Sequence, residues 1–168
     1  KMTLSTAILG FPRMGAFREL KKAIETYWKK EISEFQLQDE AKRIRKQNWE
    51  FQKNQGITHI PSNDFSFYDQ ILDLSCMLGN VPKRFEFSKN QIDLETYFNM
   101  ARGNSVDASK RQFAGEMTKW FDTNYHYIVP EFDSETSFSL KSNKIFDEFM
   151  EAKNLGIKTR PVLVGPVT

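Results

Sequence analysis

A chain of 168 residues is long enough to bury one hydrophobic core, and its 24 basic and 22 acidic residues are interleaved, which leaves no concentrated field for a polyanion. It contains no apolar run of bilayer-spanning length and no signal-peptide pattern, and its single cysteine, Cys76, cannot form an internal disulfide. We therefore expect a soluble cytoplasmic domain, or part of one, and not a nucleic-acid-binding, membrane-spanning or secreted protein.

The first predicted elements are a short strand and an amphipathic helix. The apolar run at 7–11 predicts a buried strand, and Pro12 and Gly15 predict the turn that ends it. Apolar residues at helical spacing then predict a helix that packs one face on a core; they are Leu20, Ala23, Ile24, Tyr27 and Trp28.

A second, longer helix is predicted from an N-cap at Ser33 to a stop at Gly56. Its basic run at 42–46 allows two interpretations, a site for RNA or an acidic partner or a solvated helix face. The apolar stripe that passes through Ile44 favours the solvated face.

Strands and helices alternate along the rest of the chain. The predicted elements are a strand at 57–61, a helix at 68–78, a short helix capped by Asp93, a helical face from Phe113 to Phe121, a strand at 125–129, a helix at 142–155 and a strand at 160–166. This alternation predicts an α/β fold with parallel strands joined by right-handed crossovers.

Two architectures fit that pattern, a small doubly wound sheet and the first half of a (β/α)8 TIM-type barrel, truncated after the fourth strand. Because the chain stops directly after a predicted buried strand, we expect residues 1–168 to be a piece of a larger enzyme. An open strand edge of this kind is expected to let the fragment associate with a second copy of itself.

Candidate binding groups lie where helices follow strands, which is where sites form in such folds. Arg18 and Lys21, with free backbone N–H groups of the first helical turn, could hold carboxylates or phosphates. The alternative, that both are solvated helix charges, is favoured by spacing alone.

Two further residues have open roles. Asp64, after the second strand, is a base, a ligand for a polar substrate or a helix cap, and capping is favoured. His126 points into a site or is a hydrogen-bonded core histidine, and the core role is favoured. One Cys and two widely separated His predict no catalytic zinc site, and no complete catalytic constellation is present.

Five segments resemble the cobalamin-independent methionine synthase family, also called 5-methyltetrahydropteroyltriglutamate-homocysteine methyltransferase. They occur in family order and at family spacing: LGFPR at 9–13, RELKKA at 18–23, IPSNDFSFYD at 60–69, MTKWFDTNYHY at 117–127 and RPVLVGPV at 160–167. The resemblance implies a two-barrel enzyme in which this chain is the N-terminal part of the N-terminal barrel.

The implied reaction of the full-length protein is methyl transfer from 5-methyltetrahydropteroyltri-L-glutamate to L-homocysteine, which gives methionine. The resemblance places the zinc ligands and the homocysteine site in the C-terminal barrel, which is absent here, so the fragment alone is expected to be inactive. The alternative is a non-catalytic folate-tail or protein-interaction module.

For this chain the resemblance implies binding of the folate polyglutamate tail by Arg18, Glu19, Leu20, Lys21, Lys119 and Asn124. Basic groups at a helix start suit a tail with several carboxylates. Glu19 repels a carboxylate, so its expected role is to orient Arg18 or a lysine. Phe17 departs from a more polar residue in many relatives, which leaves fine tail specificity open.

Overall fold

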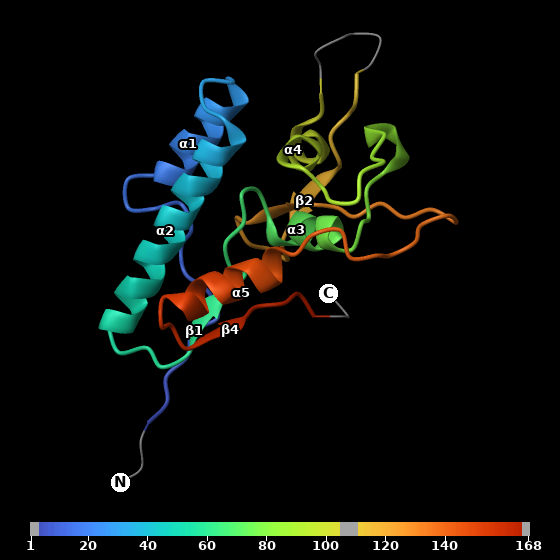
Figure 1. The fold of residues 1–168 in the computed structure, drawn as a ribbon. Coiled ribbons are helices and arrows are strands. Elements are labelled where there is room, and N and C mark those ends of the chain that lie inside the picture. Colours follow the sequence, from blue (N-terminus) through green and yellow to red (C-terminus); the bar gives the residue numbers. More distant parts are fainter. Residues whose placement is uncertain (1–3, 105–110, 166–168) are drawn as a thin grey trace. The chain divides into compact units, whose positions relative to one another are not determined.

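The computed structural model describes residues 4–104 and 111–165, and these fold into two compact units (Figure 1). The first unit contains the chain up to Phe67 together with Lys144–Leu163. The second unit contains Tyr68–Asn143 and the chain after Leu163. Each unit has its own helices and its own pair of strands.

The first unit contains two short parallel strands, β1 (Ile60–Ser62) and β4 (Thr159–Pro161). A single parallel bridge also places Ala7 beside His59, but residues 8–11 form no strand and Leu9 is 77% exposed, so the buried strand predicted at 7–11 is wrong apart from this bridge. The predicted parallel pairing is nevertheless confirmed in this unit, with strands of only three residues. Residue 166, the last of the predicted fourth strand, lies outside the described residues.

Three helices belong to the same unit: α1 (Glu19–Trp28), α2 (Glu34–Asn54) and α5 (Lys144–Asn154). In Figure 1, α1 and α2 lie side by side, and α5 packs against both β1 and β4. The predicted apolar stripes of α1 and α2 are buried at Leu20, Ile24, Leu37, Ala41 and Ile44. Burying these stripes is the main favourable contribution to pairing two amphipathic helices.

The start of α2 is set by its local sequence. Ser33 Oγ accepts a hydrogen bond from the Gln36 N–H at 3.3 Å, and Gln36 Oε1 accepts one from the Ser33 N–H at 2.8 Å. This reciprocal capping box satisfies two donors that a helix start otherwise leaves unpaired. The predicted N-cap at Ser33 is confirmed, and Gly56 follows the helix with a left-handed φ of +82°.

A small apolar cluster joins α2 and α5 to the parallel strands. It consists of Trp49, Ile60, Ala152 and Ile157, each at most 5% exposed. The Trp49 indole N–H donates to the Pro61 carbonyl at 3.0 Å, which satisfies the one polar atom of that side chain in the core. The central residue of β1 is thereby fixed to the C-terminal part of α2.

The second unit contains α3 (Gln70–Met77), a short 3-10 helix η1 (Lys83–Phe85), α4 (Leu94–Arg102), β2 (Met117–Lys119) and β3 (His126–Ile128). The predicted Asp93 cap of α4 is confirmed, since its carboxylate accepts the Thr96 N–H at 2.8 Å. Tyr97 of α4 donates to Asp73 of α3 at 2.7 Å and ties the two helices together.

Two predictions for the segment at 113–129 are wrong. Met117–Lys119 is strand β2 and not part of a helical face, and β3 pairs antiparallel with it instead of joining a parallel sheet. The cause is the short connection at 120–125, because two strands joined by so few residues can pair only as a hairpin. Phe121 adopts a left-handed φ of +51° inside this turn.

The described residues thus show a mixed α/β fold with five α-helices and short parallel strands. The predicted α/β class is confirmed. The strand predicted as fourth pairs directly with β1, without the strand predicted as third between them. Within 4–104 and 111–165, no helix combines the length and apolar content that crossing a membrane requires.

Candidate functional site

The N-cap and first turn of α1 carry four of the six residues predicted to bind substrate. Arg18 is the N-cap of α1, with a left-handed φ of +62° and no side-chain capping bond. A non-glycine residue in this conformation is strained, and such strain is concentrated at functional sites. The Arg18 backbone N–H donates to the Gly15 carbonyl, so the turn is closed without help from the guanidinium.

Glu19 interacts with the backbone of the same turn. Its Oε2 accepts the Phe17 N–H at 2.9 Å, and backbone hydrogen bonds of this kind hold the pKa of the Glu19 carboxyl below its usual value. The Glu19 carboxylate thus fixes the backbone that leads into Arg18, and its predicted role, orienting Arg18 or a lysine, stays a prediction.

Leu20 and Lys21 point to different environments. Leu20 is completely buried, so its side chain anchors the first turn of α1 in the core. Lys21 is about half exposed, and its amine lies 3.6 Å from Glu25 one turn further along. An exposed ion pair of this type contributes little to stability. Lys21 can therefore exchange the Glu25 carboxylate for that of a ligand at a small cost in free energy.

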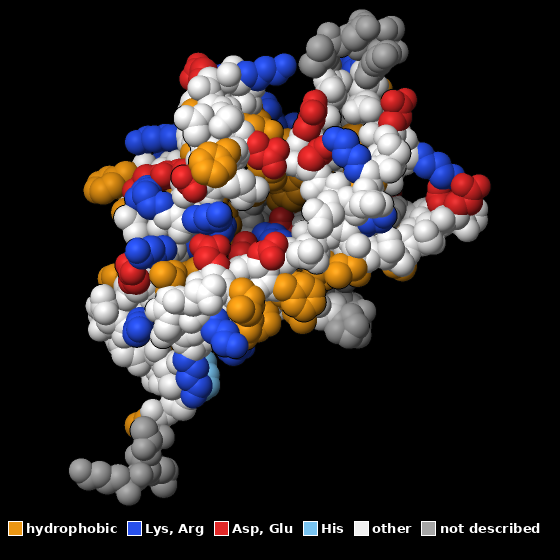
Figure 2. Space-filling model, viewed as in Figure 1, with side chains coloured by type: hydrophobic (Ala, Val, Ile, Leu, Met, Phe, Trp, Pro, Cys, Tyr) orange, Lys and Arg blue, Asp and Glu red, His pale blue; other side chains and the backbone are white. Residues whose placement is uncertain are grey.

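Opposite charges alternate over the surface of α1 and α2, as the blue and red side chains in Figure 2 show. The ion pairs there include Arg43–Glu40 and Lys46–Glu50, both on exposed faces. The solvated-face interpretation of the basic run is correct for Arg43 and Lys46. It is wrong for Arg45, which is only 6% exposed.

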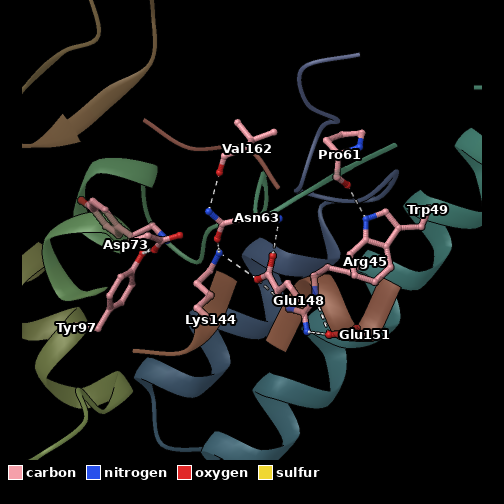
Figure 3. A network of polar contacts seen from close by, with 11 residues as sticks. Arg45, Trp49, Pro61, Asn63, Asp73, Tyr97, Lys144, Glu148, Glu151 and Val162 are labelled. Atoms are coloured by element: carbon pink, nitrogen blue, oxygen red, sulfur yellow. Dashed lines mark hydrogen bonds and ion pairs between the residues drawn. The ribbon is translucent and has the colours of Figure 1, made fainter. Parts of the chain in front are cut away.

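Arg45 belongs to a polar network at the carboxyl ends of β1 and β4, which sequence reasoning missed (Figure 3). Its guanidinium lies 2.7 Å from Glu151 and 3.9 Å from Glu148, both on α5. The Lys144 amine lies 3.1 Å from the same Glu148. A buried guanidinium needs such carboxylates because an unpaired charge there is strongly destabilising.

Asn63 connects this network to the strands. Its backbone N–H donates to Glu148 at 3.1 Å, and its side-chain amide donates to the Val162 carbonyl at 2.8 Å. Lys144 donates to the Asn63 side-chain oxygen at 3.0 Å. Asn63 adopts a left-handed φ of +58°, which Asn tolerates better than most residues. The loops after β1 and β4 are therefore held in one arrangement by charged side chains.

Asp64 has a different role from the favoured one. The N-cap of α3 is Asp69, whereas Asp64 Oδ2 accepts the Phe11 N–H at 2.9 Å. Burial raises the pKa of the Asp64 carboxyl, and the hydrogen bond from Phe11 partly offsets this. The helix-cap interpretation of Asp64 is thus wrong, because α3 begins further along the chain and its N-cap is Asp69, five residues after Asp64. Asp64 instead ties the loop before α1 to the end of β1.

The other two predicted substrate-binding residues, Lys119 and Asn124, lie on the β2–β3 hairpin of the second unit. Both are exposed. Lys119 is paired in register with His126, and His126 Nδ1 lies 3.1 Å from the Asn124 carbonyl oxygen. His126 is exposed, so the core role favoured for it is wrong; it is the first residue of β3.

The predicted site residues are therefore found in two groups. Arg18, Glu19, Leu20 and Lys21 belong to the first unit, and Lys119 and Asn124 to the second. In the first group Arg18 and Lys21 are exposed at the start of α1 beside buried Leu20, and in the second Lys119 is exposed at the end of β2. In the part of the chain that the structure describes, no group of three or more His, Cys, Asp or Glu could hold a metal ion.

The comparison with protein families gives a match over residues 5–168, to the family described as cobalamin-independent synthase, N-terminal domain. The chain belongs to the cobalamin-independent methionine synthase family. The resemblance seen in the five sequence segments is confirmed by this match over nearly the whole chain.

Curated proteins that are similar to the chain carry names of the same methionine synthase family. Proteins named 5-methyltetrahydropteroyltriglutamate–homocysteine methyltransferase are similar to the chain: that of Parvibaculum lavamentivorans is 59% identical over 98% of this chain, and that of Catharanthus roseus 53% over 98%. The Salinibacter ruber protein is 52% identical over 95% of it. The chain spans about a fifth of the length of these relatives, 21% in each case.

Proposed function

We propose that the full-length protein transfers the methyl group of 5-methyltetrahydropteroyltri-L-glutamate to L-homocysteine, giving methionine in the cytoplasm. The observation that carries this proposal is the 59% identity, over 98% of the chain, to a relative named for these two substrates. The part of the protein formed by residues 1–168 contributes folate polyglutamate binding and scaffold.

The proposed architecture is a (β/α)8 barrel of which this chain is the N-terminal part. Support comes from the parallel β1–β4 pair, the parallel bridge at Ala7 and α5 packed on both strands. In such barrels the loops after the strands carry the site. The turn that follows the Ala7 segment leads directly to Arg18, as this architecture requires.

Tail binding is proposed for Arg18 and Lys21 on α1, and for Lys119 and Asn124 on the hairpin. Their exposure is compatible with contact to a ligand, and all four offer hydrogen-bond donors to carboxylates: three are cations and Asn124 is an amide. Leu20 supports the turn from the core, and Glu19 fixes its backbone. The strained φ of Arg18 supports a functional and not a purely structural turn.

Zinc is proposed for the C-terminal domain of the full-length protein and not for this chain. The described residues contain no cluster that fits the ion, so no step of the reaction is assigned to them. Their work is to bind and orient the folate. The 168-residue chain alone is therefore expected to produce no methionine.

The test is an assay of the purified full-length protein with homocysteine and the tri- or monoglutamate form of methyltetrahydrofolate. We expect methionine to form only when both substrates are present, with a lower KM for the triglutamate. Absence of methionine from a folded, metal-loaded protein would overturn the reaction, and equal KM values for the two folates would overturn the role of the tail.

A further inference from the structure

The hairpin that carries Lys119 and Asn124 is attached to the start of α3 by a buried carboxylate. Asp69 is the N-cap of α3 and is completely buried. Its Oδ1 accepts the Leu72 N–H at 2.7 Å, which caps the helix, and its Oδ2 accepts the Ile128 N–H of β3 at 3.0 Å. One side chain therefore joins two elements that are 59 residues apart in sequence.

A second contact joins the same two elements. The Tyr125 hydroxyl oxygen accepts the backbone N–H of Gln70, the first residue of α3, at 3.0 Å. Asp69 and Gln70 are consecutive, whereas Tyr125 directly precedes β3 and Ile128 is its last residue. Attachment points on both sides of the strand fix its direction as well as its position.

The hairpin register extends this constraint to the predicted ligand contacts. Ile128 is paired with Met117, and Lys119 is paired with His126. The Trp120 N–H donates to the Tyr125 carbonyl at 2.7 Å and closes the turn next to Lys119. When β3 is held by α3, the backbone at Lys119 and Asn124 is therefore held too.

A helix cap alone does not need this arrangement, as α4 of the same unit shows. Its N-cap Asp93 accepts the Thr96 N–H at 2.8 Å, and its other oxygen pairs with exposed Lys89. Asp93 makes no bond to a strand in the part of the chain that the structure describes. Asp69, by contrast, places its second oxygen on β3, where solvent does not reach it.

We propose that Asp69, together with Tyr125, is a positioning residue for polyglutamate binding: it fixes the hairpin so that Lys119 and Asn124 are presented to the tail carboxylates. This inference rests on the proposed function. Asp69 touches no substrate in this proposal and acts only through the hairpin.

The test uses the full-length enzyme and the substitution Asp69→Asn. An amide accepts through one oxygen only, and its NH2 group then faces the other backbone N–H, so one of the two bonds is lost. We expect KM for the triglutamate to rise about five-fold, the effect of one lost hydrogen bond, with a much smaller change for the monoglutamate. Asp93→Asn is the matched control and should leave the ratio of the two KM values unchanged.

Tyr125→Phe provides a milder variant, because it removes only the hydroxyl that accepts the Gln70 N–H. It should shift the KM ratio in the same direction as Asp69→Asn. In a Lys119→Ala background, Asp69→Asn should add little to that ratio, because residues that act through each other are not additive. A drop in thermal stability with an unchanged KM ratio in both variants would overturn the positioning role.

Amide hydrogen exchange separates this inference from the proposed function. If Lys119→Ala itself leaves the KM ratio unchanged, the tail assignment of Lys119 fails. Exchange at Ile128 and Trp120 then still decides whether Asp69 holds the hairpin. Both amides should exchange faster in Asp69→Asn than in Asp93→Asn, and equal protection in the two variants would overturn the attachment.

Discussion

The guanidinium of Arg45 and the carboxylate of Glu151 lie 2.7 Å apart inside the first unit, although 106 residues separate them in sequence. Arg45 also stacks over the Phe65 ring, with its central carbon 5.1 Å from the ring centroid. α2, α5 and the loop after β1 are thus joined by one buried cation. This loop contains Asp64, which accepts the Phe11 N–H and so holds the chain before α1.

Removing that cation should destabilise the fold strongly. Arg45→Ala removes the buried guanidinium that pairs with Glu151 and Glu148, and because Glu148 keeps Lys144 and the Asn63 N–H, we expect a loss of at most about 3 to 5 kcal/mol, the usual cost of breaking a buried ion pair. Chemical denaturation, followed by tryptophan fluorescence, measures the change in the free energy of unfolding. Arg43→Ala is the control on the same helix, because its exposed pair with Glu40 is worth about 0 to 1 kcal/mol. Equal losses in the two variants would contradict the buried network.

Asp69 should make stability depend on pH in an unusual direction. Burial is the main cause that raises the pKa of its carboxyl from 3.8 to about 6, and the nearby Asp73 carboxylate acts in the same direction. The folded state therefore binds this proton more tightly than the unfolded state does. The resulting stabilisation is fully present below pH 3.8 and is lost as pH rises through about 6.

A shift of about two pKa units corresponds to roughly 3 kcal/mol between these limits. The measurement is the free energy of unfolding between pH 4 and pH 7.5, compared with that of Asp69→Asn, in which this group does not titrate. The free energy of unfolding of the unsubstituted protein, relative to that of Asp69→Asn, should fall as pH rises across that interval. A difference that stays constant from acid to neutral pH would show that the Asp69 carboxyl titrates as an ordinary exposed group.

Polyglutamate recognition should depend on Lys21 and Lys119 separately. Changing either to Ala in the full-length enzyme should weaken binding of the triglutamate substrate by about 1 to 3 kcal/mol, the range for a hydrogen bond to a charged group. The monoglutamate should be affected less, because it lacks the additional carboxylates. Steady-state KM values for both folates check this. Lys29, exposed at the other end of α1, gives the control Lys29→Ala, and an equal loss for both folates would refute the tail assignment.

The sequence predicted well those features that depend on neighbouring residues. The Ser33 and Asp93 caps are examples, since each acceptor lies three residues from its donor. The basic run around Arg45 predicts a place in solvent, whereas its partners are on α5. No local pattern carries that information. Phe113, Met117 and Trp120 fit helical spacing and so predict a helix where β2 forms, and only the tight turn that follows distinguishes the two.

Gly15 should be the most sensitive glycine of the candidate site. Its φ is +80°, and a Cβ there would lie 2.2 Å from Oε2 of Glu19, the atom that accepts the Phe17 N–H. Gly15→Ala thus combines left-handed strain of about 1 to 2 kcal/mol with displacement of the carboxylate that fixes the Arg18 turn. Gly56→Ala is the matched control, with a φ of +82° and nothing within 4 Å of the added Cβ.

Both variants should lower the stability of the folded protein by similar amounts, but only Gly15→Ala should also raise KM for the triglutamate relative to the monoglutamate. The reason is that strain at Gly56 lies after α2, whereas strain at Gly15 acts on the backbone that presents Arg18. Thermal unfolding and steady-state kinetics of the full-length enzyme measure the two effects independently. If Gly56→Ala changes the KM ratio as much as Gly15→Ala does, the turn before α1 has no specific part in binding the folate tail.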